Sequence, residues 1–203
     1  MAQESREEKF KQADEVITLL RRLRSDLNQG NAAMAIFQRG LSGHATDIER
    51  MQRVLHRFMV SDNTQADRWH EESIFLIASL FALCKNTPEG SEGNMGNHFD
   101  RARDKAASDE AVERRFSSLI SAHHEDLPVY LRRAVTYLKA QDIGIHWTRL
   151  LVDVWDWRHP DQGERARRDW ARQFWLGKNK NSTAIDIEST STLDSESLET
   201  EST

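Results

Sequence analysis

Apolar residues recur with helical spacing on both sides of a short turn between residues 111 and 138, AVERRFSSLISAHHEDLPVYLRRAVTYL. Positions three and four residues apart share one face of an α-helix, so this spacing indicates an amphipathic helix in each half. Pro128 falls near the first turn of the second pattern, where its missing N–H costs least. The stretch predicts a helical hairpin whose buried seam is formed by Val112, Phe116, Leu119, Ile120, Leu127, Leu131, Ala134, Val135 and Leu138.

Helical patterns also cover most of the remaining chain. Apolar stripes mark helices within the segments 5–27, 31–40, 46–59, 98–107 and 147–157. After a loop at 158–163, a capping box formed by Asp161 and Glu164 predicts a last helix whose inner face holds Ala166, Trp170 and Phe174. We therefore expect an all-α protein of eight or nine helices in bundle-like packing.

Two further segments complete the expected architecture. Residues 69–84 are apolar on nearly all sides, which suits a central helix; a buried strand is the competing interpretation, and the length of the run favours the helix. Residues 85–97 contain one Pro and three Gly, and they predict a loop.

The charge of the chain is unevenly distributed. The last 22 residues contain six Asp and Glu, no Lys or Arg, and Ser or Thr at half of their positions. Such a composition cannot bury enough apolar surface to offset its chain entropy, so we expect a disordered acidic Ser/Thr-rich tail at 178–203. The other 27 acidic residues face 28 Lys and Arg in the rest of the chain. We expect one helical domain over 1–177, with a division into two sub-bundles, about 1–107 and 108–177, left open.

Composition also bears on the class of protein. Cys84 is the only cysteine, which excludes an internal disulfide and a cysteine-rich zinc site, and its apolar neighbours predict a buried thiol. The N-terminal residues are charged, and no apolar run approaches the ~20 residues of a membrane span. We therefore expect a cytoplasmic protein that does not bind a membrane.

Arginines are the candidate functional residues. Adjacent pairs occur in both halves of the hairpin, and three more recur at helical spacing on the last helix, beside Trp175. Cations along a strand's backbone, with an aromatic ring for a base to stack on, are typical of single-strand binding. The competing interpretation is an ordinary solvated surface with pairs such as Glu164 and Arg168, and with Trp175 packed at the helix end.

Histidine and acidic clusters do not predict catalysis or a structural metal. His123 and His124 are adjacent, so they point ~100° apart on a helix and seldom share one ion. Asp153 and Asp156 are expected to face solvent beside an apolar stripe, and Trp157, which lies off that stripe, could serve an interface. We expect no cofactor and no metal.

The C-terminal half resembles a known family in the order and spacing of several runs. GNHFDRAR, ERRFSSLISAHHEDLPVYLRRAVTYL, HWTRLLVDVWDW and RRDWARQFW resemble CasB, the small subunit of the type I-E CRISPR Cascade complex. The resemblance covers about residues 68–176 and, more loosely, 16–60. His146 stands where the family usually has Asp, and the acidic tail is not a family feature.

The resemblance implies a non-catalytic all-α subunit. Its expected partners are crRNA and target DNA strands, the backbone and large subunits of Cascade, and a second copy of itself. Its expected role is to hold the R-loop of the target DNA through basic helix faces in antiviral defence. A scaffold or adaptor without nucleic-acid contact is the alternative. The family pattern points to Arg101, Arg114, Arg115, Arg132 and Arg133, and less directly to Arg165, Arg168 and Arg172.

Overall fold

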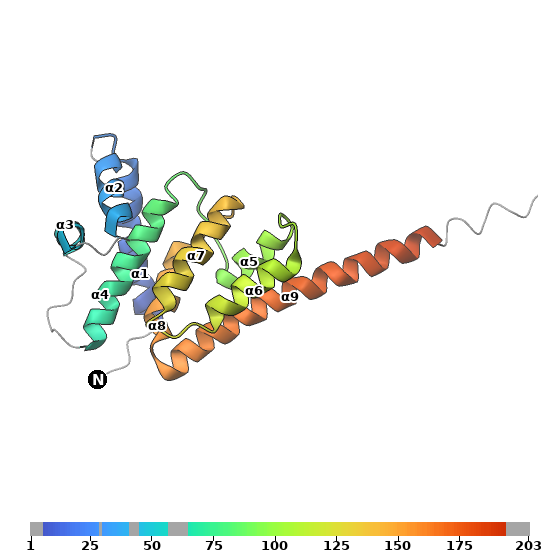
Figure 1. The fold of residues 1–203 in the computed structure, drawn as a ribbon. Helices are drawn as coiled ribbons and strands as arrows, with labels where there is room; N and C mark the ends of the chain where they lie inside the picture. The colour runs from blue at the N-terminus through green and yellow to red at the C-terminus, as the bar shows by residue number, and fades with distance from the viewer. Residues whose placement is uncertain (1–5, 29, 41–44, 57–64, 194–203) are drawn as a thin grey trace, which may run out of the picture.

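The computed structural model describes residues 6–28, 30–40, 45–56 and 65–193, and it confirms the predicted all-α fold. The described residues form nine helices and no strand, apart from one isolated bridge between Glu89 and Ile145 (Figure 1). The helices are α1 (Arg6–Ser25), α2 (Gly30–Gly40), α3 (Ala45–Leu55), α4 (Gln65–Leu83), α5 (Met95–Arg103), α6 (Asp109–Ile120), α7 (Leu127–Ala140), α8 (Trp147–Trp157) and α9 (Pro160–Leu193).

Helices α4 and α8 occupy the centre of the packing. Helix α8 contacts α1, α4 and α9, while α4 also contacts α1, α2 and α7. Nine of the eleven residues of α8 are buried, so this helix is enclosed over nearly its whole circumference. The apolar run at 69–84 is therefore a central helix, as its length predicts, and not a strand.

Close packing of α5 against α9 depends on a glycine. A Cβ atom built on Gly96 would lie 1.9 Å from the carbonyl oxygen of Trp170, so the two helices approach too closely for any side chain there. Asn94 caps α5 by accepting the amide N–H of Gly96 and of Asn97, and the Asn97 side chain accepts the Asn94 N–H in return. Helix α5 thus begins at Met95, inside the segment that the sequence predicts as a loop.

Helix α9 differs from prediction at both of its ends. It begins at Pro160, whose fixed φ suits a first helical turn, so Asp161 lies inside the helix and the predicted capping box with Glu164 is wrong. It also continues to Leu193, where the sequence predicts a disordered tail from residue 178. A helix closes its backbone hydrogen bonds within itself, and no proline follows Pro160 to interrupt it. In Figure 1 its distal part extends away from the other helices, while residues 194–203 lie outside the described part.

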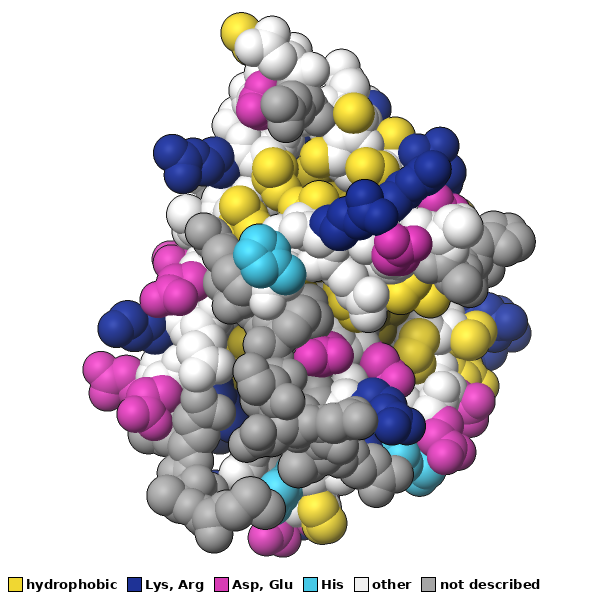
Figure 2. Space-filling view, turned by 90° about the vertical axis from the view of Figure 1, so that its left-hand side faces the viewer, with side chains coloured by type: hydrophobic (Ala, Val, Ile, Leu, Met, Phe, Trp, Pro, Cys, Tyr) yellow, Lys and Arg dark blue, Asp and Glu magenta, His cyan; other side chains and the backbone are white. Residues whose placement is uncertain are grey.

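Helices from before and after residue 107 pack against one another. Helix α5 contacts α6, α7 and α9, all of which follow it in the chain, and α1 contacts α8 across most of the chain's length. The division into sub-bundles at about residue 107 stays a prediction. Figure 2 shows the side at the left of Figure 1, where hydrophobic side chains gather in the upper half with Lys and Arg on both sides of them.

Candidate nucleic-acid interface

The hairpin of α6 and α7 places its arginines by burying the residues between them. Ser108 caps α6 by accepting the Ala111 N–H, and Val112, Phe116 and Leu119 turn inward. Helix α7 buries its own stripe, with Pro128 in its first turn. The remaining positions face outward, and they expose Arg114, Arg115, Arg132 and Arg133.

Arg115 and Arg133 lie at one groove between the two helices. The groove has a volume of about 300 Å³ and is lined by Arg115, Ser118, Tyr130, Arg133 and Ala134. The guanidinium carbon of Arg115 lies 4.9 Å from the ring centroid of Tyr137, and that of Arg133 lies 5.7 Å from the ring centroid of Tyr130. We call this surface the Arg–Tyr groove.

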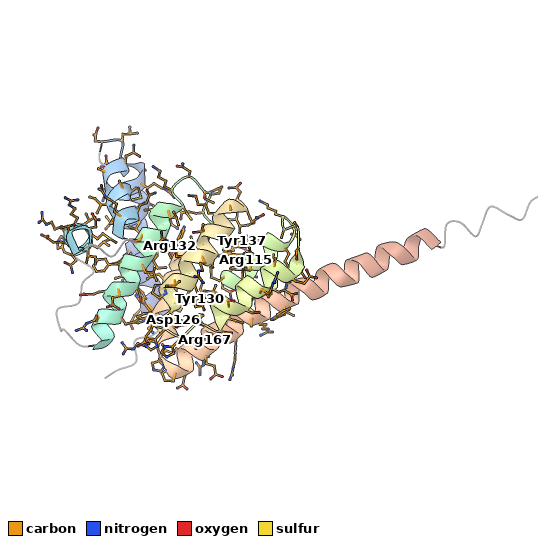
Figure 3. All side chains as sticks on the ribbon, viewed as in Figure 1. Arg115, Asp126, Tyr130, Arg132, Tyr137 and Arg167 are labelled. Atoms are coloured by element: carbon orange, nitrogen blue, oxygen red, sulfur yellow. The ribbon has the colours of Figure 1, made fainter. Side chains whose placement is uncertain are left out.

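The other two hairpin arginines lie elsewhere. Arg114 is exposed, and its Nε donates to the carbonyl of Glu110 on its own helix. Arg132 lies on the α4 side of α7, whereas Arg115, Tyr130 and Tyr137 lie toward α6 (Figure 3). There Arg132 borders a larger apolar groove of about 570 Å³, lined by α3, α4 and α7 and including the half-exposed Val129.

The arginines of α9 face away from its inner stripe, as predicted. Ala166, Trp170 and Phe174 are buried, while Arg165 and Arg172 are exposed. Arg165 borders a cavity of about 120 Å³ against α1 and α8, and Arg172 borders a neighbouring hollow that also includes Arg149.

Arg168 and Trp175, also on α9, differ from Arg165 and Arg172 in their surroundings. Arg168 forms an ion pair with Glu164, which compensates its charge. Trp175 is 40 % exposed, and its ring contacts that of Phe174.

Arg101 on α5 lies beside a buried histidine. Its Nη2 is 2.5 Å from Nδ1 of His98, and the His146 amide N–H donates to the other ring nitrogen at 3.1 Å. Burial, with the charges of Arg101 and His146, lowers the pKa of His98 to about 3. The ring is therefore neutral at physiological pH, and Arg101 remains the exposed cation of this pair.

The eight arginines do not form one patch. They lie at the Arg–Tyr groove, at the α4 side of α7, along the outer face of α9, and on α5 and α6 individually. Among the described residues, Arg168 alone of the eight forms an ion pair with a carboxylate. The other seven form no ion pair with a carboxylate within the described part, and they are Arg101, Arg114, Arg115, Arg132, Arg133, Arg165 and Arg172.

Several residues near these surfaces are missing from the sequence prediction. Tyr130 and Tyr137 are the only tyrosines of the chain, and both lie on the α6 side of α7. The signal was available, since Tyr130, Arg133 and Tyr137 are separated by three and four residues. Arg103 is also missing from the prediction: its side chain is only 7 % exposed and it packs on the ring of Phe174. No spacing in the sequence distinguishes this buried arginine from the exposed Arg101.

Two predictions on α8 are wrong. Asp153 is buried, and it accepts hydrogen bonds from Arg149 Nε at 2.9 Å and from the indole N–H of Trp170 at 2.7 Å. Asp156 is largely buried and pairs with Lys9. Trp157 is 1 % exposed, and its indole N–H donates to the Ala122 carbonyl, so it is a core residue. The error arises because α8 is enclosed on nearly all sides, so a single apolar stripe underestimates its burial.

The described part of the chain contains no group of three His, Cys, Asp or Glu side chains placed to hold a metal ion. Cys84 is buried, as predicted, and burial raises its pKa to about 11. Within the same residues, no helix combines the length and apolarity that a membrane span requires.

Comparison with known proteins identifies the family. The family model for CRISPR-associated protein Cse2 matches residues 33–175. A Cse2 protein of Thermus thermophilus is 29 % identical over 145 residues, which cover 71 % of this chain and 79 % of the relative. The crystal structure of M. ruber CasB is similar with a TM-score of 0.66 and 27 % identity, over 85 % of this chain and 97 % of the other.

A chain of a CRISPR RNA-guided surveillance complex has the same fold, with a TM-score of 0.70 at 20 % identity over 87 % of this chain and 99 % of that one. The residues matched by the family model extend from α2 into α9 and so include most of the described helices. The chain belongs to the Cse2 family, whose solved members include CasB.

Proposed function

We propose that this protein is a non-catalytic small subunit of a crRNA-guided surveillance complex, and that it stabilises the R-loop of target DNA in antiviral defence. Membership of the Cse2 family supports assembly of this protein into such a complex, since a structural relative is a chain of a CRISPR RNA-guided surveillance complex. The observation that carries nucleic-acid contact is the set of seven exposed arginines that form no ion pair with a described carboxylate.

The mechanism is electrostatic. Unpaired guanidinium groups neutralise phosphates and release condensed counterions, which favours the opened strands over the closed duplex. The arginines lie on several surfaces, which suits contact with more than one stretch of strand. Contacts with phosphates do not depend on the base sequence. Base pairing between the guide RNA and the target strand supplies the sequence specificity. The proposed partners are therefore crRNA and target DNA strands, backbone and large subunits, and a second copy of the chain.

A salt titration of target binding by the assembled complex tests the proposal. The test variant replaces Arg132, Arg165 and Arg172 with alanine, all outside the Arg–Tyr groove. Removal of each arginine that meets a phosphate should lower the slope of log K against log salt by about 0.7 to 0.9, similarly for different target sequences. Arg53→Ala is the control, since Arg53 is already paired with Glu49 on α3. An intact complex with unchanged slope and affinity would contradict nucleic-acid contact by these residues.

The alternative is a scaffold that joins neighbouring subunits without touching a strand. The apolar groove between α3, α4 and α7 favours it, because a half-exposed Val129 beside apolar walls suits contact with another protein subunit. The scaffold hypothesis predicts that Val129→Glu impairs assembly, while the arginine variants leave target affinity unchanged. A complex that fails to assemble with the arginine variant would also favour it.

A further inference from the structure

The Arg–Tyr groove brings together two kinds of side chain that recognise the two parts of a nucleotide. Arg115 and Arg133 enter it from different helices, and the described residues offer neither of them a carboxylate partner. Tyr130, which is partly buried, lines the same groove. No acidic residue lines the groove, so an anion entering it meets only positive charge.

Arg115 is held in place before any ligand binds. The Arg115 guanidinium lies over the Tyr137 ring, and its Nη1 donates to the Ala111 carbonyl at 2.9 Å. A guanidinium that stacks on an aromatic ring keeps its N–H donors at its edge, where they can meet phosphate oxygens. Ordering the Arg115 side chain on binding therefore costs less entropy than ordering a free surface arginine would.

Tyr130 is the tyrosine that lines the groove, and the Arg133 guanidinium lies over its ring, 5.7 Å from the ring centroid. Tyr137 stacks on Phe99, with ring centroids 5.9 Å apart, while Arg115 covers its ring as well. Burial also raises the pKa of Tyr137. Small side chains at Ser118 and Ala134 keep the groove open next to Tyr130.

The other hollows fit a nucleotide less well. The cavity at Arg165 is lined by three cations and by three aspartates, so its charges balance. The apolar groove at Arg132 contains glutamates as well as arginines. Among these surfaces the Arg–Tyr groove combines an aromatic ring with positive charge and no negative charge.

We propose that the Arg–Tyr groove is a single-nucleotide site for an unpaired base: a phosphate binds between Arg115 and Arg133, and the base stacks on Tyr130. The proposal rests on the proposed function and deepens it, because it adds an interaction that only a single strand can make. A base within a duplex is already stacked on its neighbours, whereas an unpaired base offers a free face. The groove therefore favours the opened strand over the duplex.

The test compares two probes that share a charged backbone and differ in their bases. One is a short oligothymidylate, and the other is an abasic sugar–phosphate oligomer of the same length; both are titrated against the full-length protein. We expect the wild-type protein to bind the thymidylate about fivefold or more tightly, as stacking of one base on an aromatic ring implies. Tyr130→Leu should remove this preference without weakening abasic binding, and Tyr130→Phe should retain it.

Arginine variants separate the charge from the ring. Arg115→Gln with Arg133→Gln should weaken both probes equally, and it should reduce the salt slope by about 0.7 for each phosphate that is no longer neutralised on a single strand. Val129→Ala, on the same helix but outside the groove, is the matched control for α7.

Each adverse outcome has a distinct meaning. A wild-type protein that binds both probes equally, with strong salt dependence, would overturn the stacking site and leave the proposed function standing. Retention of the preference by Tyr130→Leu would likewise overturn the site. Salt-independent or absent binding of both probes would overturn the site together with strand contact by this chain. The wild-type comparison needs no variant, so it does not depend on how well Tyr130→Leu folds.

Discussion

His98 and Asp153 are buried titratable residues whose pKa values move in opposite senses. Burial, with Arg101 and His146, lowers the pKa of His98 from 6.5 to about 3. Between these two pH values His98 is therefore neutral in the folded state and protonated in the unfolded chain. Burial raises the pKa of Asp153 from 3.8 to about 6, against the opposing effect of Arg149. The stability that neutral His98 supplies is present above pH 6.5 and is lost as the pH falls toward 3. The stability that protonated Asp153 supplies is present below pH 3.8 and is lost as the pH rises through 6.

These signs predict distinct pH profiles for two variants. Relative to His98→Gln, the wild-type free energy of unfolding should fall by about 2 kcal/mol between pH 7 and pH 5, since one pKa unit corresponds to about 1.4 kcal/mol. Relative to Asp153→Asn, it should rise by about 1 kcal/mol over the same range. Chemical denaturation at a series of pH values measures both differences. Parallel profiles for wild type and His98→Gln would show that His98 titrates normally in the folded protein.

Single residues mark the limit of what the sequence could predict. The inward positions of Trp170 and Phe174 follow directly from helical spacing, because one stripe of α9 packs on the core. Asp153 and Trp157 do not, because α8 is enclosed by α1, α4 and α9 and so buries positions outside its stripe. Periodicity reports one preferred face, and it cannot report how many neighbours a helix has.

At the scale of elements, Arg103 joins three helices. It extends from α5 to form ion pairs with Asp109 at 2.8 Å and with Glu113 at 3.5 Å, both on α6. It also donates to the Phe174 carbonyl of α9 at 3.0 Å, and its guanidinium carbon lies 3.7 Å from the centroid of the Phe174 ring. Its charge is largely removed from water, so these partners offset the cost of its burial.

Replacement of Arg103 should therefore destabilise the fold. Arg103→Met keeps much of the aliphatic packing but removes the cation that pairs with the acids of α6 and the donor to the Phe174 carbonyl. We expect a loss of about 2–3 kcal/mol, below the range for a fully buried pair, because Asp109 is 43 % exposed. Arg114→Met, an exposed position on α6, is the control and should change stability by less than about 0.5 kcal/mol. Equal effects of the two replacements in a denaturant titration would contradict the role of Arg103.

The helices themselves were largely predictable, and their ends were not. The apolar stripes locate the hairpin and α8 to within a residue or two, because burial of one face largely determines that helices form there. The start of α5 depends on Asn94 and Asn97 capping each other, a pair that a Gly-rich stretch conceals. The start of α9 depends on Pro160 opening the helix ahead of Asp161. Both choices depend on local hydrogen bonds and dihedral angles, which leave little trace in the hydrophobic pattern.

At the scale of the whole molecule, the arrangement of the arginines could not be read from the chain. Spacing predicts that Arg132 and Arg133 lie outside the apolar stripe of α7, and both are exposed. Which neighbour each one faces depends on the packing of α4 and α6 against α7. That packing directs Arg133 to the Arg–Tyr groove and Arg132 to the apolar groove. Helix crossing angles arise from packing across the whole core, so they are not encoded in any single segment.

Charge is unevenly distributed over the whole molecule, and the acidic C-terminal segment should weaken the binding of nucleic acid by the arginines. The segment after position 181 contains six acidic residues and no Lys or Arg, while the rest of the chain is close to neutral. Their negative potential opposes a phosphate backbone wherever the two approach within a Debye length, about 10 Å at 0.1 M salt. The distal part of α9 extends away from the other helices in Figure 1.

Truncation after residue 181 should thus change the free energy of unfolding by less than about 0.5 kcal/mol, because a helical segment that extends away from the other helices is marginal by itself. It should raise affinity for single-stranded DNA about twofold or more at low salt, and this gain should vanish at ~1 M salt, where the Debye length is about 3 Å.

A full-length variant that neutralises only the acids separates charge from chain length, and it should show the same gain. A large loss of stability on truncation would show instead that the segment docks on the body. Equal affinities of the wild-type and neutralised proteins at low salt would show that its charge does not reach the nucleic acid. The neutralised variant carries Asp186→Asn, Glu188→Gln, Asp194→Asn, Glu196→Gln, Glu199→Gln and Glu201→Gln.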